Sequence, residues 1–139
     1  DLAAAPLGML VSSAACHGNG GSADRFREEL MKVVITGGAG FLGQLLIRAL
    51  CARGRLTDAA GEERAVEQIV AIDQGHTARL FVDERVGYVV GDISVPTLLK
   101  HVMATDTACV FHLAAVVSGA AEADFDLGMH VNLDGTRAL

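Results

Sequence analysis

Residues 32–43 constrain the fold of this chain more than any other stretch. They read Lys-Val-Val-Ile-Thr-Gly-Gly-Ala-Gly-Phe-Leu-Gly, a short apolar run that stops at a glycine cluster, inside which a helical pattern begins. A buried strand, a tight turn and a helix N-terminus in that order present unpaired backbone N–H groups and the positive end of the helix dipole to an anion. The stretch therefore predicts a pyrophosphate site of the dinucleotide-binding kind.

The glycines of this stretch fit two registers. Gly38, Gly40 and Gly43 satisfy G-x-G-x-x-G, whereas Gly37, Gly40 and Gly43 satisfy G-x-x-G-x-x-G. In the wider register Gly37 makes the turn, Gly40 admits the pyrophosphate, and Gly43 lets the helix pack closely on the strand.

Strand and helix patterns alternate along the rest of the chain. The predicted strands are residues 32–36, 69–73, 86–90 and 108–113, and the predicted helices are residues 40–53, 95–103 and 125–139. Runs of consecutive apolar residues are typical of strands that are buried on both faces. This alternation predicts an α/β fold, the N-terminal half of a Rossmann-type doubly wound parallel sheet with about four strands in the order 3-2-1-4.

Several local features refine this prediction. We expect the first helix to turn an apolar stripe toward the sheet, made of Leu42, Leu45, Leu46, Ala49 and Leu50. Ser94 is the predicted N-cap of the second helix, and Pro96 falls near its first turn. Residues 56–67 and 116–123 are predicted to be connections without regular structure.

The length of 139 residues allows one domain with a substantial core. Residues 31–139 carry the alternating pattern and form the predicted dinucleotide-binding part. Residues 1–30 are rich in Ala, Gly and Ser, and no basic segment precedes their apolar part. We expect them to be a disordered leader or an artefactual extension.

Charge and cysteine usage exclude several classes of function. A formal net charge of −6 argues against a nucleic-acid partner. No apolar run reaches the roughly 18–20 residues that span a bilayer, which argues against a membrane partner. Cys16, Cys51 and Cys109 are odd in number and far apart, so we expect free thiols, a cytoplasmic location and no metal site. A homo-oligomer is compatible with the sequence.

Two carboxylates follow predicted strands. Asp73 ends the second strand, where it can accept hydrogen bonds from the adenosine ribose and repel a 2′-phosphate, which selects NAD over NADP. Asp92 follows the third strand, where it can accept the adenine amino group while Ile93 packs on the ring. A solvated strand-end residue is the alternative for Asp73, and a simple turn with a helix cap is the alternative for Asp92.

The fourth strand ends in His-Leu-Ala-Ala, residues 112–115, where small side chains let a cofactor approach the backbone. His112 lies inside the strand, which favours a structural histidine over a catalytic base. Ser118 and His130 have no local pattern of partners, so we expect both to lie on the surface or in a loop.

Five motifs in a fixed order resemble a known family. They are residues 36–43 (Thr-Gly-Gly-Ala-Gly-Phe-Leu-Gly), Asp73, residues 91–93 (Gly-Asp-Ile), residues 111–115 (Phe-His-Leu-Ala-Ala) and residues 131–136 (Val-Asn-Leu-Asp-Gly-Thr). The chain resembles the extended short-chain dehydrogenases/reductases, the NAD-dependent epimerase/dehydratase group. Residues 56–61, 113–119 and 122–129 resemble the D-erythronate dehydrogenase subfamily, whose NAD-linked enzymes oxidise a four-carbon sugar acid at C2.

The resemblance implies a role for each matching position. It implies that Gly37, Gly40, Phe41, Leu42 and Gly43 cradle the pyrophosphate of NAD, that Asp73 binds the ribose, that Asp92 and Ile93 bind adenine, and that Leu113, Ala114 and Ala115 lie along the middle of the cofactor. It also implies that Ser118 lies near a sugar-acid substrate and that Asn132 supports the active-site backbone.

One departure limits the mechanism. The family uses a Tyr-x-x-x-Lys pair, in which the tyrosine takes the hydroxyl proton while hydride leaves for the nicotinamide. The chain has one tyrosine, Tyr88, and Asp92 stands four residues later. We therefore expect an N-terminal fragment that binds NAD but has no catalytic residue of its own. A nucleotide-sugar epimerase or dehydratase and a non-catalytic NAD-binding regulator are the alternatives.

Overall fold

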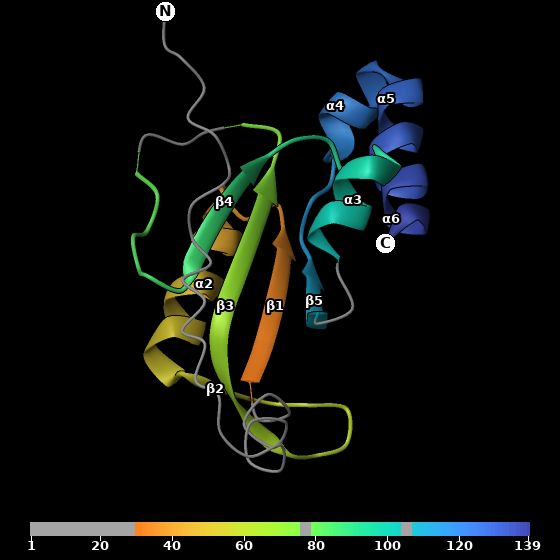
Figure 1. Cartoon of the computed structure of the whole chain (residues 1–139). Helices are drawn as coiled ribbons and strands as arrows, with labels where there is room; N and C mark the ends of the chain where they lie inside the picture. The colour runs from red at the N-terminus through yellow and green to blue at the C-terminus, as the bar shows by residue number, and fades with distance from the viewer. Residues whose placement is uncertain (1–29, 76–78, 104–106) are drawn as a thin grey trace, which may run out of the picture.

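The computed structural model describes residues 30–75, 79–103 and 107–139 (Figure 1). The predictions for residues 1–29 and for Cys16 lie outside the described residues. Four parallel strands lie side by side in the order β4-β3-β1-β5. They are β1 (Leu30–Thr36), β3 (Glu63–Asp73), β4 (Val86–Val90) and β5 (Thr107–His112). In chain order this is the predicted arrangement 3-2-1-4, so the α/β Rossmann-type fold is confirmed.

Helices cover both faces of the sheet (Figure 1). On one face, Val33 and Ile35 of β1 pack with Ile47 of α2 (Phe41–Arg53). On the other face, Val34 packs with Leu99 of α3 (Pro96–Val102). Because successive side chains of a strand point to opposite faces, the unbroken apolar run of β1 supplies both cores at once.

The face of α2 that meets the sheet matches the predicted stripe at Leu46 and Leu50, which pack in the core, and differs from it elsewhere. Gly43, Ile47 and Leu50 are buried, whereas Leu42 is 63% exposed and Leu45 is 49% exposed. The cause is Gly43, where an added Cβ would lie only 2.6 Å from Gly38 Cα. This close approach fixes the rotation of the helix, so the buried residues are those that share a face with Gly43.

Residues 56–67 are not the irregular connection that we predicted. β2 (Arg55–Thr57) pairs antiparallel with the first part of β3, which begins at Glu63. Asp58 closes the hairpin, because its Oδ1 accepts hydrogen bonds from the backbone N–H groups of Ala60 and Glu62. Charged residues along an exposed edge hid this hairpin from a search for apolar periodicity.

The predicted cap of α3 is also wrong. Val95 occupies the N-cap position and makes no side-chain cap hydrogen bond. The Ser94 hydroxyl lies one residue too early and contacts Asp92 and His130 instead. Pro96 starts the helix, as expected.

The C-terminal part is helical for more of its length than predicted. Residues 116–123, predicted as a loop, contain α4 (Ser118–Ala123). The single predicted helix 125–139 divides into α5 (Phe125–Met129), the π-helical turn η1 (His130–Asp134) and α6 (Gly135–Ala138). Asp124 separates α4 from α5, because its side chain accepts a hydrogen bond from the N–H of Leu127. Among the described helices, none has the length and apolar character to cross a membrane.

Candidate cofactor-binding site

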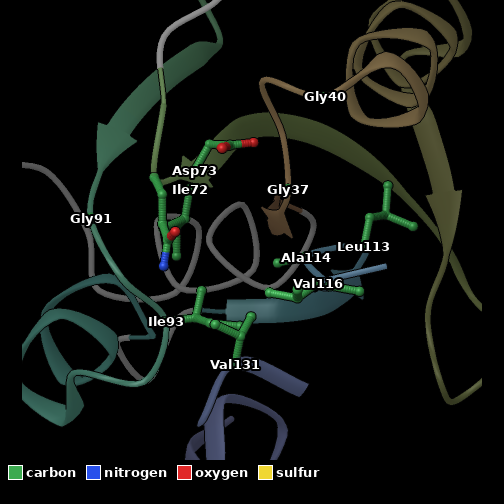
Figure 2. Close-up of a pocket in the computed structure, with 12 residues that line it drawn as sticks. Gly37, Gly40, Ile72, Asp73, Gly91, Ile93, Leu113, Ala114, Val116 and Val131 are labelled. Carbon is green, nitrogen blue, oxygen red and sulfur yellow. The ribbon is translucent and has the colours of Figure 1, made fainter. Parts of the chain in front are cut away.

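A cavity of about 230 Å³ opens at the carboxyl ends of the parallel strands (Figure 2). Seven predicted site residues line it: Gly37, Gly40, Asp73, Ile93, Leu113, Ala114 and Ala115. Five further residues complete the lining: Ile72, Gln74, Gly91, Val116 and Val131. Ligands of open α/β sheets bind at this edge, where the connections of neighbouring strands diverge. We call residues 37–43 the glycine turn and this turn with Asp73 the glycine wall, of which Gly37, Gly40 and Asp73 line the cavity, and we call residues 113–116 the β5 wall.

The turn of the glycine wall requires glycine at Gly37. Its φ of +70° lies in the left-handed region, and an added Cβ would lie 2.8 Å from the backbone nitrogen of Ala114. Gly38 has no positive φ, but a Cβ there would lie 2.5 Å from the Cβ of Ala71. The left-handed turn therefore belongs to the wider register of Gly37, Gly40 and Gly43.

At the start of α2, backbone N–H groups and not side chains are the groups available to a ligand. Gly40 is the N-cap, and the Phe41 side chain is 79% exposed. Phe41, Leu42 and Gly43 do not line the cavity, and the first N–H groups of a helix have no acceptor within that helix. The arrangement suits an anion held by backbone N–H groups.

Asp73 joins the end of β3 to the glycine turn. Its Oδ2 accepts a hydrogen bond from the Ala39 N–H at 3.0 Å, and its Oδ1 accepts one from the Gly75 N–H at 3.2 Å. Each carboxylate oxygen has two lone pairs, so both oxygens keep capacity for ligand hydroxyls. The residue that the sequence singled out for ribose thus lies in the cavity with acceptor capacity left.

Asp92 and Ile93 separate in the structure. Ile93 is 3% exposed and lines the cavity, and Gly135 allows α6 to approach it, since an added Cβ there would lie 2.8 Å from Ile93 Cδ1. Asp92 does not line the cavity. Its Oδ1 accepts hydrogen bonds from the backbone N–H and the hydroxyl of Ser94. The adenine role of Asp92 stays a prediction.

The contact between Ser94 and His130 was not visible in the sequence. His130 Nε2 lies 2.6 Å from Ser94 Oγ and 3.9 Å from Asp92 Oδ2, and Asp134 lies 3.8 Å from the other ring nitrogen. Burial raises the pKa of the Asp92 carboxyl, but hydrogen bonds from Ser94 and the nearby His130 ring outweigh burial and hold that pKa below its usual range.

This cluster does not form an activated serine. The Ser94 hydroxyl has one hydrogen, and the Asp92 carboxylate at 2.7 Å is a stronger acceptor than an imidazole nitrogen. The His130 ring therefore donates to Ser94. The cluster fastens η1 to the loop after β4, and His130 is exposed, as expected, but lies in η1 and not in a loop.

Tyr88 and Gln44 form a second network outside the cavity. Gln44 donates from Nε2 to the Gly38 carbonyl at 2.7 Å and to the Tyr88 hydroxyl at 3.1 Å, and its Oε1 accepts from the Phe81 N–H. The Tyr88 hydroxyl donates to the Phe81 carbonyl. Tyr88 is thus a structural residue, and Gln44 supports the glycine turn through its hydrogen bond to the Gly38 carbonyl.

Asn132 holds the β5 wall. Its Oδ1 accepts from the Val116 N–H at 2.8 Å, and its Nδ2 donates to the Val116 carbonyl at 2.9 Å. Ser118 is the first residue of α4, and its substrate role stays a prediction. Cys51 and Cys109 are free and half-buried, and burial raises the pKa of both thiols. Cys51 and Cys109 are therefore weak nucleophiles.

The fold and this cavity define an α/β protein of the Rossmann type, and comparison with known proteins identifies its family. The model of the 3-beta hydroxysteroid dehydrogenase/isomerase family matches residues 34–139. The chain belongs to this family, and its resemblance to the extended short-chain dehydrogenases/reductases is confirmed.

The chain is also similar to individual proteins of known name. The chain is 54% identical to a D-erythronate dehydrogenase of Cupriavidus necator and 38% identical to one of Haemophilus influenzae, over 78% and 77% of this chain. It spans about a third of their length, 33% and 31%. Among solved structures, it is similar to a nucleoside-diphosphate-sugar epimerase of Agrobacterium tumefaciens, with 36% identity, a TM-score of 0.64, and coverage of 78% of this chain and 31% of the other.

Proposed function

We propose that this chain is the NAD(H)-binding portion of an NAD-dependent oxidoreductase that acts on a small sugar acid. The observation that carries the proposal is the position of Asp73 on the cavity, where its carboxylate accepts a hydrogen bond from the glycine turn and lies beside Gly37, which tolerates no Cβ. The residues present fit the cofactor: N–H groups of residues 41–43 for the pyrophosphate, Asp73 for the ribose, and Ile93 with residues 113–115 for the apolar rings. Bound NAD would supply the hydride acceptor.

The proposed substrate is a four-carbon acid of the D-erythronate type, oxidised at C2. The support is the 54% identity to a D-erythronate dehydrogenase. An epimerase acting on a nucleotide sugar is the second candidate, supported by the 36% identity to a nucleoside-diphosphate-sugar epimerase. We expect this chain alone to be inactive, because its single tyrosine, Tyr88, is engaged by Gln44 and Phe81. NADH production from D-erythronate by the chain would overturn this expectation.

Calorimetric titration of the 139-residue chain with NAD and NADP tests the cofactor assignment. We expect NAD to bind more tightly, because the Asp73 carboxylate repels a 2′-phosphate. Asp73→Ala should weaken NAD binding roughly tenfold or more and NADP binding much less, since a charged hydrogen-bond acceptor is lost. Asp126→Ala, an exposed carboxylate of α5, is the matched control. Equal losses for the two cofactors would remove Asp73 from this role.

A further inference from the structure

Three side chains from three separate elements meet beneath the β5 wall. Thr36 ends β1 and is completely buried, His112 ends β5, and Thr136 lies on α6. Thr36 Oγ1 lies 2.6 Å from His112 Nδ1, and His112 Nε2 lies 3.0 Å from Thr136 Oγ1. One imidazole ring thus bridges the strand that feeds the glycine turn and the last helix.

The hydrogen bonds at Thr36 favour one role for one ring nitrogen. Thr36 Oγ1 accepts a hydrogen bond from the N–H of Ala114 at 3.2 Å and shares the N–H of Leu113, which also donates to the Thr36 main-chain carbonyl at 3.1 Å. A hydroxyl oxygen has two lone pairs and one hydrogen, so its acceptor capacity is largely used. Its hydrogen is left for His112 Nδ1, 2.6 Å away, and this end of the ring suits an unprotonated Nδ1.

The hydrogen bonds at Thr136 fix the other ring nitrogen independently. The Thr136 hydroxyl donates to the main-chain carbonyl of Asn132 at 2.6 Å, and a carbonyl is only an acceptor. The single hydrogen of Thr136 is therefore engaged, so His112 Nε2 must donate. The Thr136 end therefore requires a hydrogen on Nε2, and the Thr36 end accommodates an unprotonated Nδ1, so the neutral ring with its hydrogen on Nε2 satisfies both.

The same chain of hydrogen bonds continues into the β5 wall. Asn132, whose carbonyl accepts from Thr136, holds both backbone polar groups of Val116 with its side chain. Asn132 lies in the π-helical turn η1, a type of local widening that is common at functional sites. The β5 wall is therefore tied at Leu113 and Ala114 by Thr36 and at Val116 by Asn132.

We propose that His112 is a positioning residue, locked as the Nε2-protonated neutral tautomer, that sets the β5 wall against the glycine turn. The ring accepts on the Thr36 side and donates on the Thr136 side, so one orientation of the wall satisfies every group. This proposal deepens the proposed function, because its effect on the cofactor rests on NAD binding in the cavity. The tautomer itself does not depend on any ligand.

Nitrogen NMR of the chain labelled with ¹⁵N-histidine tests the tautomer in mildly alkaline buffer. We expect the His112 Nε2 to show the signature of a protonated nitrogen and Nδ1 that of an unprotonated one. His101→Gln and His112→Asn assign the signals by elimination, and exposed His101 serves as the reference ring. A protonated Nδ1, or a tautomer mixture equal to that of His101, would overturn the proposal.

Paired threonine variants test the coupling to the cavity. Thr136→Val should release the Nε2 tautomer preference and weaken NAD binding roughly threefold to tenfold, the effect of one lost hydrogen bond. Thr136→Ser keeps the hydroxyl and should restore both properties. Thr97→Val, at an exposed position of α3, is the control for the loss of a hydroxyl. Equal effects of Thr97→Val and Thr136→Val would contradict the coupling.

NAD binding and the His112 tautomer spectra together distinguish a failure of the proposed function from a failure of the positioning role of His112. If the unsubstituted chain does not bind NAD, the proposed function fails, and the tautomer spectra alone decide the inference. If NAD binds but Thr136→Val leaves the His112 tautomer unchanged, the proposed function stands and the positioning role of His112 is wrong.

Discussion

The two walls of the cavity are built by different physical means. The glycine wall depends on sterics over a short stretch of sequence, because Gly37 and Gly43 each exclude a Cβ. The β5 wall depends on hydrogen bonds between side chains far apart in sequence, such as Thr36 with His112 and Asn132 with Val116. Steric contacts resist change sharply, whereas single hydrogen bonds contribute about 1 kcal/mol each. We therefore expect the glycine wall to be rigid and the β5 wall to be adjustable.

The largest expected effect breaks the glycine wall. Gly43→Ala places a methyl group against the Gly37 carbonyl and 2.6 Å from Gly38 Cα, and both neighbours are backbone. Because backbone cannot yield as a side chain can, we expect a loss of about 3 kcal/mol in the free energy of unfolding, measured by denaturant titration. Gly119→Ala in α4, where an added Cβ meets nothing within 4 Å, should be neutral or slightly stabilising. Similar losses for both variants would show that Gly43 is not sterically restricted.

An intermediate effect should be confined to the β5 wall. Asn132→Ala removes both hydrogen bonds to Val116, so amide exchange over residues 113–116 should accelerate about fivefold to tenfold. Exchange at the glycine turn should not change. Asn132→Asp keeps the acceptor for the Val116 N–H but loses the donor, and should give a smaller acceleration. Equal acceleration of amide exchange at both walls would contradict the claim that Asn132 holds the β5 wall alone.

The smallest expected effect concerns the contact between η1 and the loop after β4. The pKa of Asp92 is lower in the folded chain than in the unfolded chain, so its contribution to stability is present above the unfolded pKa and is lost as the pH falls through the folded value. Asp92→Asn should therefore cost about 0.5–1 kcal/mol at neutral pH and less in acid. Denaturant titrations in neutral and acidic buffer measure this difference, with Asp126→Asn as the control. A cost that does not decline in acid would contradict this assignment.

The difference between the walls also explains what the sequence could predict. The strands and the turn at Gly37 follow from apolar runs and glycine spacing, which are local patterns. The buried face of α2 was predicted only in part: Leu46 and Leu50 of the expected stripe pack in the core, but the approach of Gly43 to Gly38 sets the rotation and leaves Leu42 and Leu45 exposed. The β2 hairpin was missed because its residues are charged and exposed.

The side-chain hydrogen bonds around the site could not be predicted from the sequence for another reason. The packing of separate elements alone brings together the pairs that form these bonds, such as Ser94 with His130 and Thr36 with His112. No spacing rule connects such residues in a single sequence. The resemblance to a family pointed to Asn132, but the residues that orient it and its target, Val116, emerge only from the structure.

Amide chemical-shift mapping with NAD tests most directly the claim that both walls hold one dinucleotide. We predict that NAD perturbs residues 37–43 of the glycine turn and residues 113–116 of the β5 wall at the same ligand concentration, with smaller shifts for NADP. Perturbation of only one wall, or of neither, at concentrations that saturate the chain would contradict it.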